Sequence, residues 1–212
     1  GGVYCQGTGS VISNCVIANN AASGFAGGVY SGTIYDSLIV SNRSLGSYGG
    51  GAYNSILKGC TVSHNRAYNY GGGGSSLTAS NCVFSFNRAN GGGAASGGTF
   101  YNCLMYGNLA DSQGGGAVWH SVSLYNCTIV GNQLNGSAAG IGGGGIYVGS
   151  TRTVVAINCI VYSNQATAGP NIYVNPPGIL YITNSCTIPE IPGWNAGNTT
   201  NAPFFITHGT DY

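Results

Sequence analysis

The chain has 212 residues, of which 43% are hydrophobic and only 4% charged, and its formal net charge is +1. Ordinary globular proteins are about 25% charged, so we expect a folded chain with a polar but uncharged surface. Five basic residues give no charge pattern for nucleic-acid binding. No run approaches the ~18 apolar residues that a membrane span needs, so no membrane span is expected.

One sequence motif recurs along the chain at steps of 21 to 32 residues, a period typical of solenoids. The copies are rich in Val, Ile, Thr and Tyr and are cut by Asn and Gly, which favours strands over helices. They read NCVIANNAA from Asn14, DSLIVSNRS from Asp36, GCTVSHNRA from Gly59, NCVFSFNRA from Asn81, NCLMYGNLA from Asn102, NCTIVGNQL from Asn126 and NCIVYSNQA from Asn158.

Each copy predicts two short strands joined at a corner. The Cys position and the apolar residue two places later face the same side, but another apolar position lies three residues before the Cys. A continuous strand cannot keep that offset on one face, so the chain must bend at the Asn, which tolerates a left-handed corner. A third strand is expected after each glycine run, where a tight corner excludes side chains. Three strands per coil predict a parallel β-helix.

Two polar columns follow from the same alignment. The second Asn of each copy predicts an amide ladder, formed by Asn20, Asn42, Asn65, Asn87, Asn108, Asn132 and Asn164. The Cys register contains Cys15, Cys60, Cys82, Cys103, Cys127, Cys159 and Cys186, with Ser37 in the second copy. Coils ~4.8 Å apart permit either a stack of free thiols or disulfides, which need ~4.4–6.8 Å between Cα atoms. Cys5 lies outside this register and is expected to be the exposed thiol.

The pairing of GG[AGIV] with [FIV]xxN, as at Phe84–Asn87 and Ile129–Asn132, resembles the repeat of polymorphic outer-membrane proteins of bacteria. The resemblance covers roughly residues 1–175. It implies an all-β, right-handed parallel β-helix of about seven or eight coils that is exported to the cell surface or beyond. Residues 176–212 resemble the segment that closes such β-helices in bacterial surface proteins.

Little in the sequence points to catalysis. The four acidic residues, Asp36, Asp111, Glu190 and Asp211, form no cluster for acid–base chemistry. His64, His120 and His208 share no register, and a zinc site needs about four converging ligands. We therefore expect no enzyme activity, no metal and no cofactor.

Two rows of side chains are candidate contact surfaces. Arg43, Arg66 and Arg88 each follow the second Asn and should stack on successive coils, either to bind an anionic glycan or simply as solvated side chains. The aromatic candidates, which either contact glycans or proteins or only stabilise the coils, are Tyr30, Tyr53, Trp119, Tyr147 and Tyr173. Glycosylation sequons occur at Asn42, Asn126, Asn135 and Asn198. Asn126 should be inaccessible at its corner, whereas Asn135 lies in the longest loop.

These features predict a structural or adhesive β-helix outside the cell, as a filament subunit or a segment of a larger surface protein. The sequence starts within a coil and shows no capping helix, so self-association through open ends is expected. The alternative is a carbohydrate-binding or polysaccharide-degrading β-helix module. Because the sequence opens without Met, any targeting segment is expected to be removed or to lie outside it.

Overall fold

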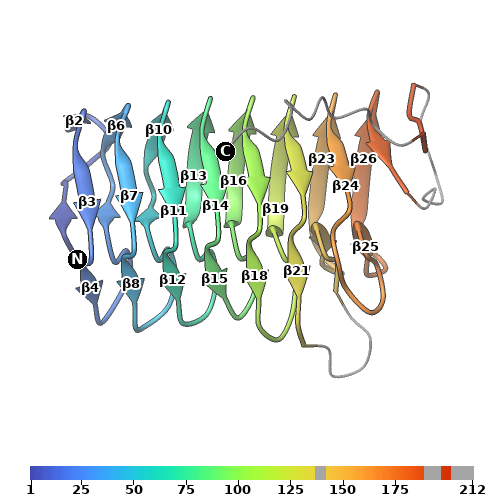
Figure 1. Cartoon of the computed structure of the whole chain (residues 1–212), viewed down its shortest axis with the longest axis horizontal. Coiled ribbons are helices and arrows are strands. Elements are labelled where there is room, and N and C mark those ends of the chain that lie inside the picture. Colours follow the sequence, from blue (N-terminus) through green and yellow to red (C-terminus); the bar gives the residue numbers. More distant parts are fainter. Residues whose placement is uncertain (137–141, 189–196, 202–212) are drawn as a thin grey trace, which may run out of the picture.

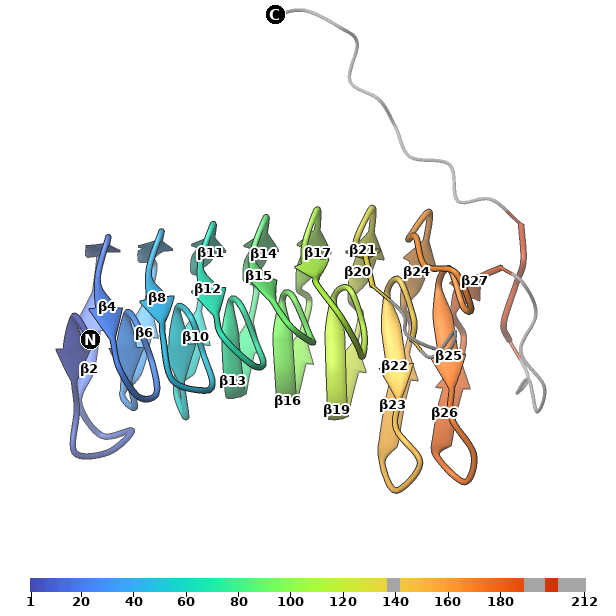
Figure 2. The ribbon, with the colours of Figure 1, turned by 90° about the horizontal axis from the view of Figure 1, so that it is seen from below.

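The computed structural model describes residues 1–136, 142–188 and 197–201, which form a solenoid of about eight coils (Figure 1). The strands pair in parallel with the strands one coil away, so three sheets run along the molecule. Seen from below, the coils follow one another in chain order (Figure 2). The described residues contain no helix, and thus none with the length and apolarity that crossing a membrane requires. The predicted parallel β-helix is confirmed.

The sheets are built from short strands. Sheet A contains β1 (Val3–Tyr4), β2 (Val11–Ser13), β5 (Val29–Tyr30), β6 (Thr33–Tyr35), β9 (Ala52–Tyr53), β10 (Ile56–Lys58), β13 (Gly74–Ser80), β16 (Ala95–Tyr101), β19 (Val118–Tyr125), β22 (Ile146–Val148), β23 (Thr153–Ile157), β25 (Ile172–Val174) and β26 (Ile179–Thr183). Sheet B contains β3 (Val16–Ala18), β7 (Leu38–Val40), β11 (Thr61–Ser63), β14 (Val83–Ser85), β17 (Leu104–Tyr106), β20 (Thr128–Val130), β24 (Ile160–Tyr162) and β27 (Cys186–Thr187). Sheet C contains β4 (Ala21–Ala22), β8 (Arg43–Ser44), β12 (Arg66–Ala67), β15 (Arg88–Ala89), β18 (Leu109–Ala110) and β21 (Gln133–Leu134).

The core lies between the inward faces of sheets A and B. Both predicted apolar columns are buried there: Ile34, Leu57, Ala79, Phe100, Leu124 and Ala156 from sheet A, and Ile39, Val62, Phe84, Met105, Ile129 and Val161 from sheet B. The corner residues between them have φ angles of 44° to 56°: Asn14, Asp36, Asn81, Asn102, Asn126 and Asn158. The predicted left-handed corner is therefore confirmed.

The strand pattern differs from the prediction in two respects. Sheet C is an additional sheet whose two-residue strands directly follow the second Asn of each copy. In β13, β16 and β19 the strand after the glycine run continues to the corner, where two separate strands are expected. Within each of these long strands, the regular pairing is interrupted at one residue in left-handed conformation: Ser76 (φ 55°), Gly97 (φ 71°) and His120 (φ 70°).

The glycine runs lie where sheet A passes close to the backbone of sheet C. A methyl group on Gly72 would lie 2.5 Å from the backbone nitrogen of Arg88 and 2.5 Å from the carbonyl oxygen of Gly93. One coil earlier, a methyl group on Gly50 would meet Arg66 in the same way. The predicted exclusion of side chains at this corner is confirmed, and its cause here is close backbone packing.

The segment 176–212 begins as a further part of the solenoid. Its strands β26 and β27 pair with β23 and β24. Much of the remainder, including Glu190, His208 and Asp211, lies outside the described residues.

Candidate functional site

The asparagine ladder, Asn20 to Asn164, follows sheet B and immediately precedes sheet C. Oδ1 of Asn87 accepts hydrogen bonds from the backbone nitrogen (2.9 Å) and Nδ2 (3.1 Å) of Asn65, one coil before. Nδ2 of Asn87 donates to Oδ1 of Asn108 at 3.0 Å and to the carbonyl oxygen of Val62 at 2.8 Å. The ladder residues from Asn42 onwards are buried, so their amides hold coils together and are not exposed to a ligand.

The ladder ends within its last coil. The backbone nitrogen and Nδ2 of Asn164 both donate to Oδ1 of Asn171 at 3.0 Å. Asn171 lies only seven residues further along the chain, and its own Nδ2 donates to the carbonyl oxygen of Ile188. The loop between β24 and β25 therefore folds back to supply the terminal acceptor, a feature that the repeat does not predict.

Two expectations about the sequons are wrong. Asn42 is 1% exposed and its amide belongs to the ladder, so it is not accessible as a glycan acceptor in the folded protein. Asn126 is exposed rather than inaccessible, because its corner projects the amide outward, where Nδ2 donates to Asn102 at 3.1 Å. Asn198 accepts a hydrogen bond from the backbone nitrogen of Ser185 at 2.8 Å. Asn135 is exposed in its loop and is the best-placed acceptor of the four.

All eight cysteines are free, which supports the thiol stack over disulfides. The register differs from the prediction at its end, because Ile160 pairs with Cys186 and the Cys159 nitrogen donates to Ser185 Oγ at 2.9 Å. Ser185 therefore occupies the cysteine position of that coil. Cys5 is 8% exposed and lies against Gly32, whereas Cys15 on the first coil is exposed, which reverses the expectation for Cys5.

Thiol reactivity should follow this burial. The Cys60 thiol is 1% exposed, and its donation of a hydrogen bond to Cys82, together with burial, raises its pKa, so its nucleophilic thiolate is scarce at neutral pH. We expect one fast-reacting thiol, Cys15, when the native chain is treated with Ellman's reagent, and eight after denaturation. The Cys15→Ser variant should lose the fast phase. Several fast-reacting thiols in the native chain would contradict the buried stack.

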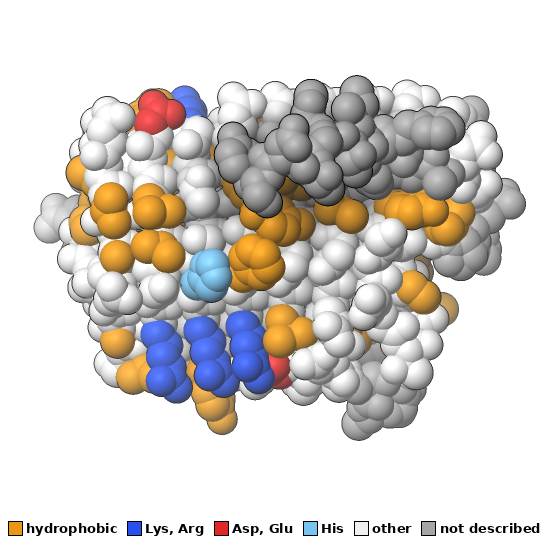
Figure 3. Space-filling model, viewed as in Figure 1, with side chains coloured by type: hydrophobic (Ala, Val, Ile, Leu, Met, Phe, Trp, Pro, Cys, Tyr) orange, Lys and Arg blue, Asp and Glu red, His pale blue; other side chains and the backbone are white. Residues whose placement is uncertain are grey.

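The arginine row, Arg43, Arg66 and Arg88, forms as predicted on successive strands of sheet C (Figure 3). Asp111 closes one end of the row, because Arg88 Nε donates to its two carboxylate oxygens at 2.8 and 2.9 Å. This hydrogen bond and the negative charge raise the pKa of Arg88. Within the described part of the chain, Arg43 and Arg66 have no carboxylate partner. The row therefore offers two free guanidinium groups and one neutralised group.

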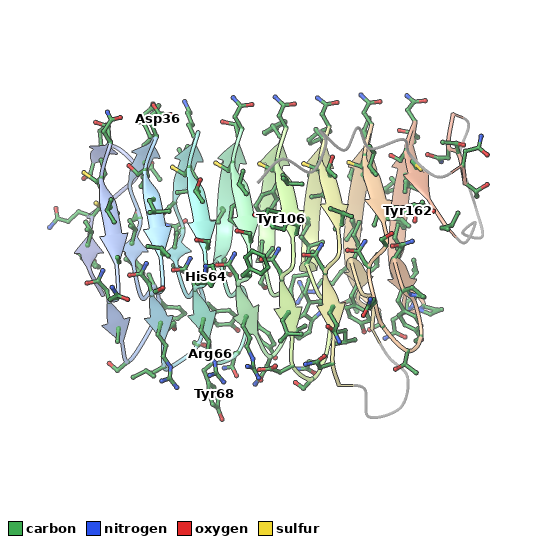
Figure 4. The ribbon with its side chains drawn as sticks, viewed as in Figure 1. Asp36, His64, Arg66, Tyr68, Tyr106 and Tyr162 are labelled. Atoms are coloured by element: carbon green, nitrogen blue, oxygen red, sulfur yellow. The ribbon has the colours of Figure 1, made fainter. Side chains whose placement is uncertain are left out.

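The space beside the arginine row is small. Its hollow measures about 70 Å³ and is lined in part by Arg66, Tyr68 and Asn90. Figure 4 shows Arg66 and Tyr68 at the sheet C edge, opposite the edge that carries Asp36. Ligand pockets usually measure about 300–1,000 Å³, so this row fits a contact along the surface rather than an enclosed ligand.

The aromatic row, Tyr4, Tyr30, Tyr53, Trp119, Tyr147 and Tyr173, lies on sheet A directly after the glycine corner. Tyrosine rings on adjacent coils stack at each end of the row, with centroids 5.5 Å apart for Tyr30–Tyr53 and 5.9 Å apart for Tyr147–Tyr173. Tyr147 is only 8% exposed, so this candidate contact residue supports its neighbours instead of facing a ligand. Tyr4 is not among the predicted contact residues, yet it is 74% exposed and extends the row by one coil.

Catalytic groups do not gather in the described ranges. Asp36 lies at the corner between sheets A and B, whereas Asp111 follows β18 of sheet C and is held by Arg88. No group of three or more His, Cys, Asp or Glu side chains in these ranges is arranged to hold a metal ion. The arginine and aromatic rows are thus the features that a functional proposal must address.

Three parallel sheets, an apolar interior and a stacked amide column define a parallel β-helix solenoid. A family model described as a right-handed β-helix region matches residues 1–134. The chain belongs to the right-handed β-helix family. No curated protein and no solved structure matches it. Because one fold can carry unrelated activities, the role of this chain has to be argued from its surfaces.

Proposed function

We propose that the protein is a non-enzymatic structural or adhesive β-helix that acts at the cell surface or outside the cell. Its copies would stack end to end in a filament, or it would form a segment of a larger surface protein. The observation that carries this proposal is a core that is only partly covered at both end coils. Val3 and Ile12 in the first coil, and Ile172 and Leu180 in the last, are partly buried, whereas the central core residues are fully buried. A stacked copy, or further coils of a larger protein, would bury these side chains and continue sheets A and B.

Composition supports a role outside the cell. The surface is polar and almost uncharged, and the repeat resembles that of polymorphic outer-membrane proteins, a relationship that we also propose. The separation of Asp36 from Asp111 supports a non-enzymatic role, because glycoside hydrolysis uses two carboxyl groups about 5–9.5 Å apart.

Electron microscopy of the purified chain tests the filament. We expect filaments with an axial repeat of ~35–40 Å per copy, since about eight coils lie ~4.8 Å apart. The Ile12→Lys variant places a charge on the stacking surface of the first coil and should remain monomeric, with a circular dichroism spectrum like that of the parent chain. A parent chain that stays monomeric at high concentration would refute stacking.

The second candidate function is binding or cleavage of an acidic polysaccharide along the arginine row. Arg43 and Arg66 lie on adjacent strands without carboxylate partners in the described ranges, and an anionic chain would relieve their mutual repulsion. Binding or turnover of polygalacturonate that is lost in Arg66→Gln would support this candidate. Polygalacturonate that neither binds nor is cleaved would eliminate it.

A further inference from the structure

The aromatic row is interrupted in the middle of the solenoid. On β13 and β16, Ser75 and Ser96 occupy the positions that Tyr53 and Trp119 hold on the flanking coils. Two consecutive rings are therefore missing, over a distance of about 10 Å at ~4.8 Å per coil. A hollow of about 350 Å³ opens at this gap, within the range of about 300–1,000 Å³ typical of ligand sites. We name it the aromatic hollow; its lining includes Phe25, Tyr48, Tyr53, Ser75, Ser96 and His120.

One wall of the aromatic hollow consists of three rings that support one another. The Phe25 centroid lies 4.8 Å from that of Tyr53 and 5.7 Å from that of Tyr48. Phe25 comes from a loop, and it is 45% exposed although it is one of the most apolar side chains. Because each ring is held by its neighbours, the wall is in place before a ligand arrives, which reduces the entropic cost of binding.

His120 forms another part of the lining, and two aromatic rings pack against its imidazole. Its ring centroid lies 4.6 Å from that of Trp119 and 5.6 Å from that of Tyr70. Burial lowers the pKa of His120, and the positive charge of Arg152 lowers it further. The neutral imidazole has one nitrogen that donates a hydrogen bond and one that accepts. It can therefore bind a hydroxyl group in either direction.

The backbone conformation at His120 recurs along the sheet. The equivalent positions in the two preceding coils are held by Ser76 and Gly97, and all three residues are left-handed. Histidine is one of the residues enriched in that conformation, and on β19 it places an imidazole at the hollow.

The chemistry of the lining defines its occupant. The side chains are aromatic, hydroxyl or neutral imidazole groups, and none carries a charge at neutral pH. Ser75 and Ser96 lie at the floor and are each 4% exposed, and Ser75 Oγ donates to the carbonyl oxygen of Ser96 at 2.9 Å, so His120 is the hydrogen-bonding side chain open to a ligand hydroxyl. Arg152 next to His120 disfavours a cation. A suitable ligand is neutral, has flat apolar faces for the rings, and has hydroxyl groups at its edges.

We propose that the aromatic hollow binds a hexopyranose unit of a neutral glycan, which stacks on Tyr53 and Phe25 and forms hydrogen bonds to His120. The sugar ring takes the place of the rings missing from the aromatic row. This binding goes beyond the stacking function, since it uses the side of the solenoid and leaves both end coils free.

Titration with neutral tetrasaccharides of glucose, mannose and galactose, followed by calorimetry and saturation-transfer NMR, tests this site. At least one should bind and transfer saturation from aromatic protons. The Ser96→Tyr variant continues the aromatic row into the hollow, in register with Trp119, and should weaken binding by at least about tenfold, or about 1.4 kcal/mol. The control is Ser80→Tyr, which extends the separate Tyr101–Tyr125 stack and should bind like the parent chain.

A second variant covers the case in which Ser96→Tyr does not fold. Phe25→Ser changes an exposed loop residue and should also weaken binding at least about tenfold. The site is refuted if no neutral tetrasaccharide binds, or if a bound one is insensitive to the hollow variants that fold. It is also refuted if binding is limited to tetragalacturonate and is lost in Arg66→Gln. If the Ser96→Tyr variant still forms filaments, end-to-end stacking is independent of glycan binding at the aromatic hollow.

Discussion

Replacing Asn87 by alanine is expected to lower the free energy of unfolding by about 2–6 kcal/mol. The change removes the acceptor of the buried Asn65 backbone nitrogen and the side-chain donor to the Val62 carbonyl oxygen, whereas the Asn65 side-chain amide keeps its bond to the Ile39 carbonyl oxygen at 2.8 Å. Each buried polar group left unsatisfied costs about 1–3 kcal/mol. Since domains are stable by only about 5–15 kcal/mol, the loss is a large fraction of the total. Urea denaturation followed by circular dichroism measures it.

Asn20 provides the matched control for this prediction. It is half-buried on the first coil, and its side chain donates to Asn42 at 3.0 Å. In Asn20→Ala, the Asn42 oxygen retains the bond from the Asn20 backbone nitrogen, so the loss should be about 1 kcal/mol. Equal losses in the two variants would show that the ladder does not stabilise the coils in the way its hydrogen bonds indicate.

The Gly72→Ala variant should lose about 3 kcal/mol or more. A methyl group there would lie within 2.6 Å of three backbone atoms, which belong to Arg88 and Gly93. Those atoms are fixed by coil-to-coil hydrogen bonds, so the structure can relieve the overlap only by moving two strands apart. The midpoint of urea denaturation should fall accordingly.

Gly24→Ala is the control for Gly72. No atom lies within 4 Å of a methyl group at this position, and the backbone conformation suits any residue. Alanine there should stabilise the chain slightly, by about 0.5 kcal/mol, because it restricts the unfolded state. The two substitutions are chemically identical, so their opposite signs test the packing argument directly. A stable Gly72→Ala variant would disprove it.

The sequence contains most of the information needed for the coil. A repeated Asn before the Cys position was sufficient to predict the left-handed corner, since few other residues adopt it. The prediction that Cys186 belongs to the cysteine register was wrong because it aligned Cys186 with Cys159 instead of aligning the corner asparagines of the two coils. Asn184 has a φ angle of 49°, and aligning it with Asn158 places Ser185 in the cysteine register.

The surfaces were harder to predict because they depend on loops. The gap at Ser75 and Ser96 is visible once the residues after each glycine corner are aligned. Phe25 and Tyr48, however, come from loops between copies, where the repeat sets no geometry. The Arg88–Asp111 pair joins residues one coil plus two residues apart, an offset that becomes meaningful only when sheet C is known.

The asparagine ladder also gives the solenoid an electrical direction. From Asn20 to Asn164, each side-chain amide donates toward the next coil and exposes its oxygen toward the previous one. Each amide dipole is about 3.5 D, and dipoles aligned head to tail add together. The first coil is thus the negative pole of the ladder. Two copies brought together by their first coils would set like poles against each other, whereas copies in the same orientation would attract. Assembly in one orientation is therefore favoured before any side chain makes contact.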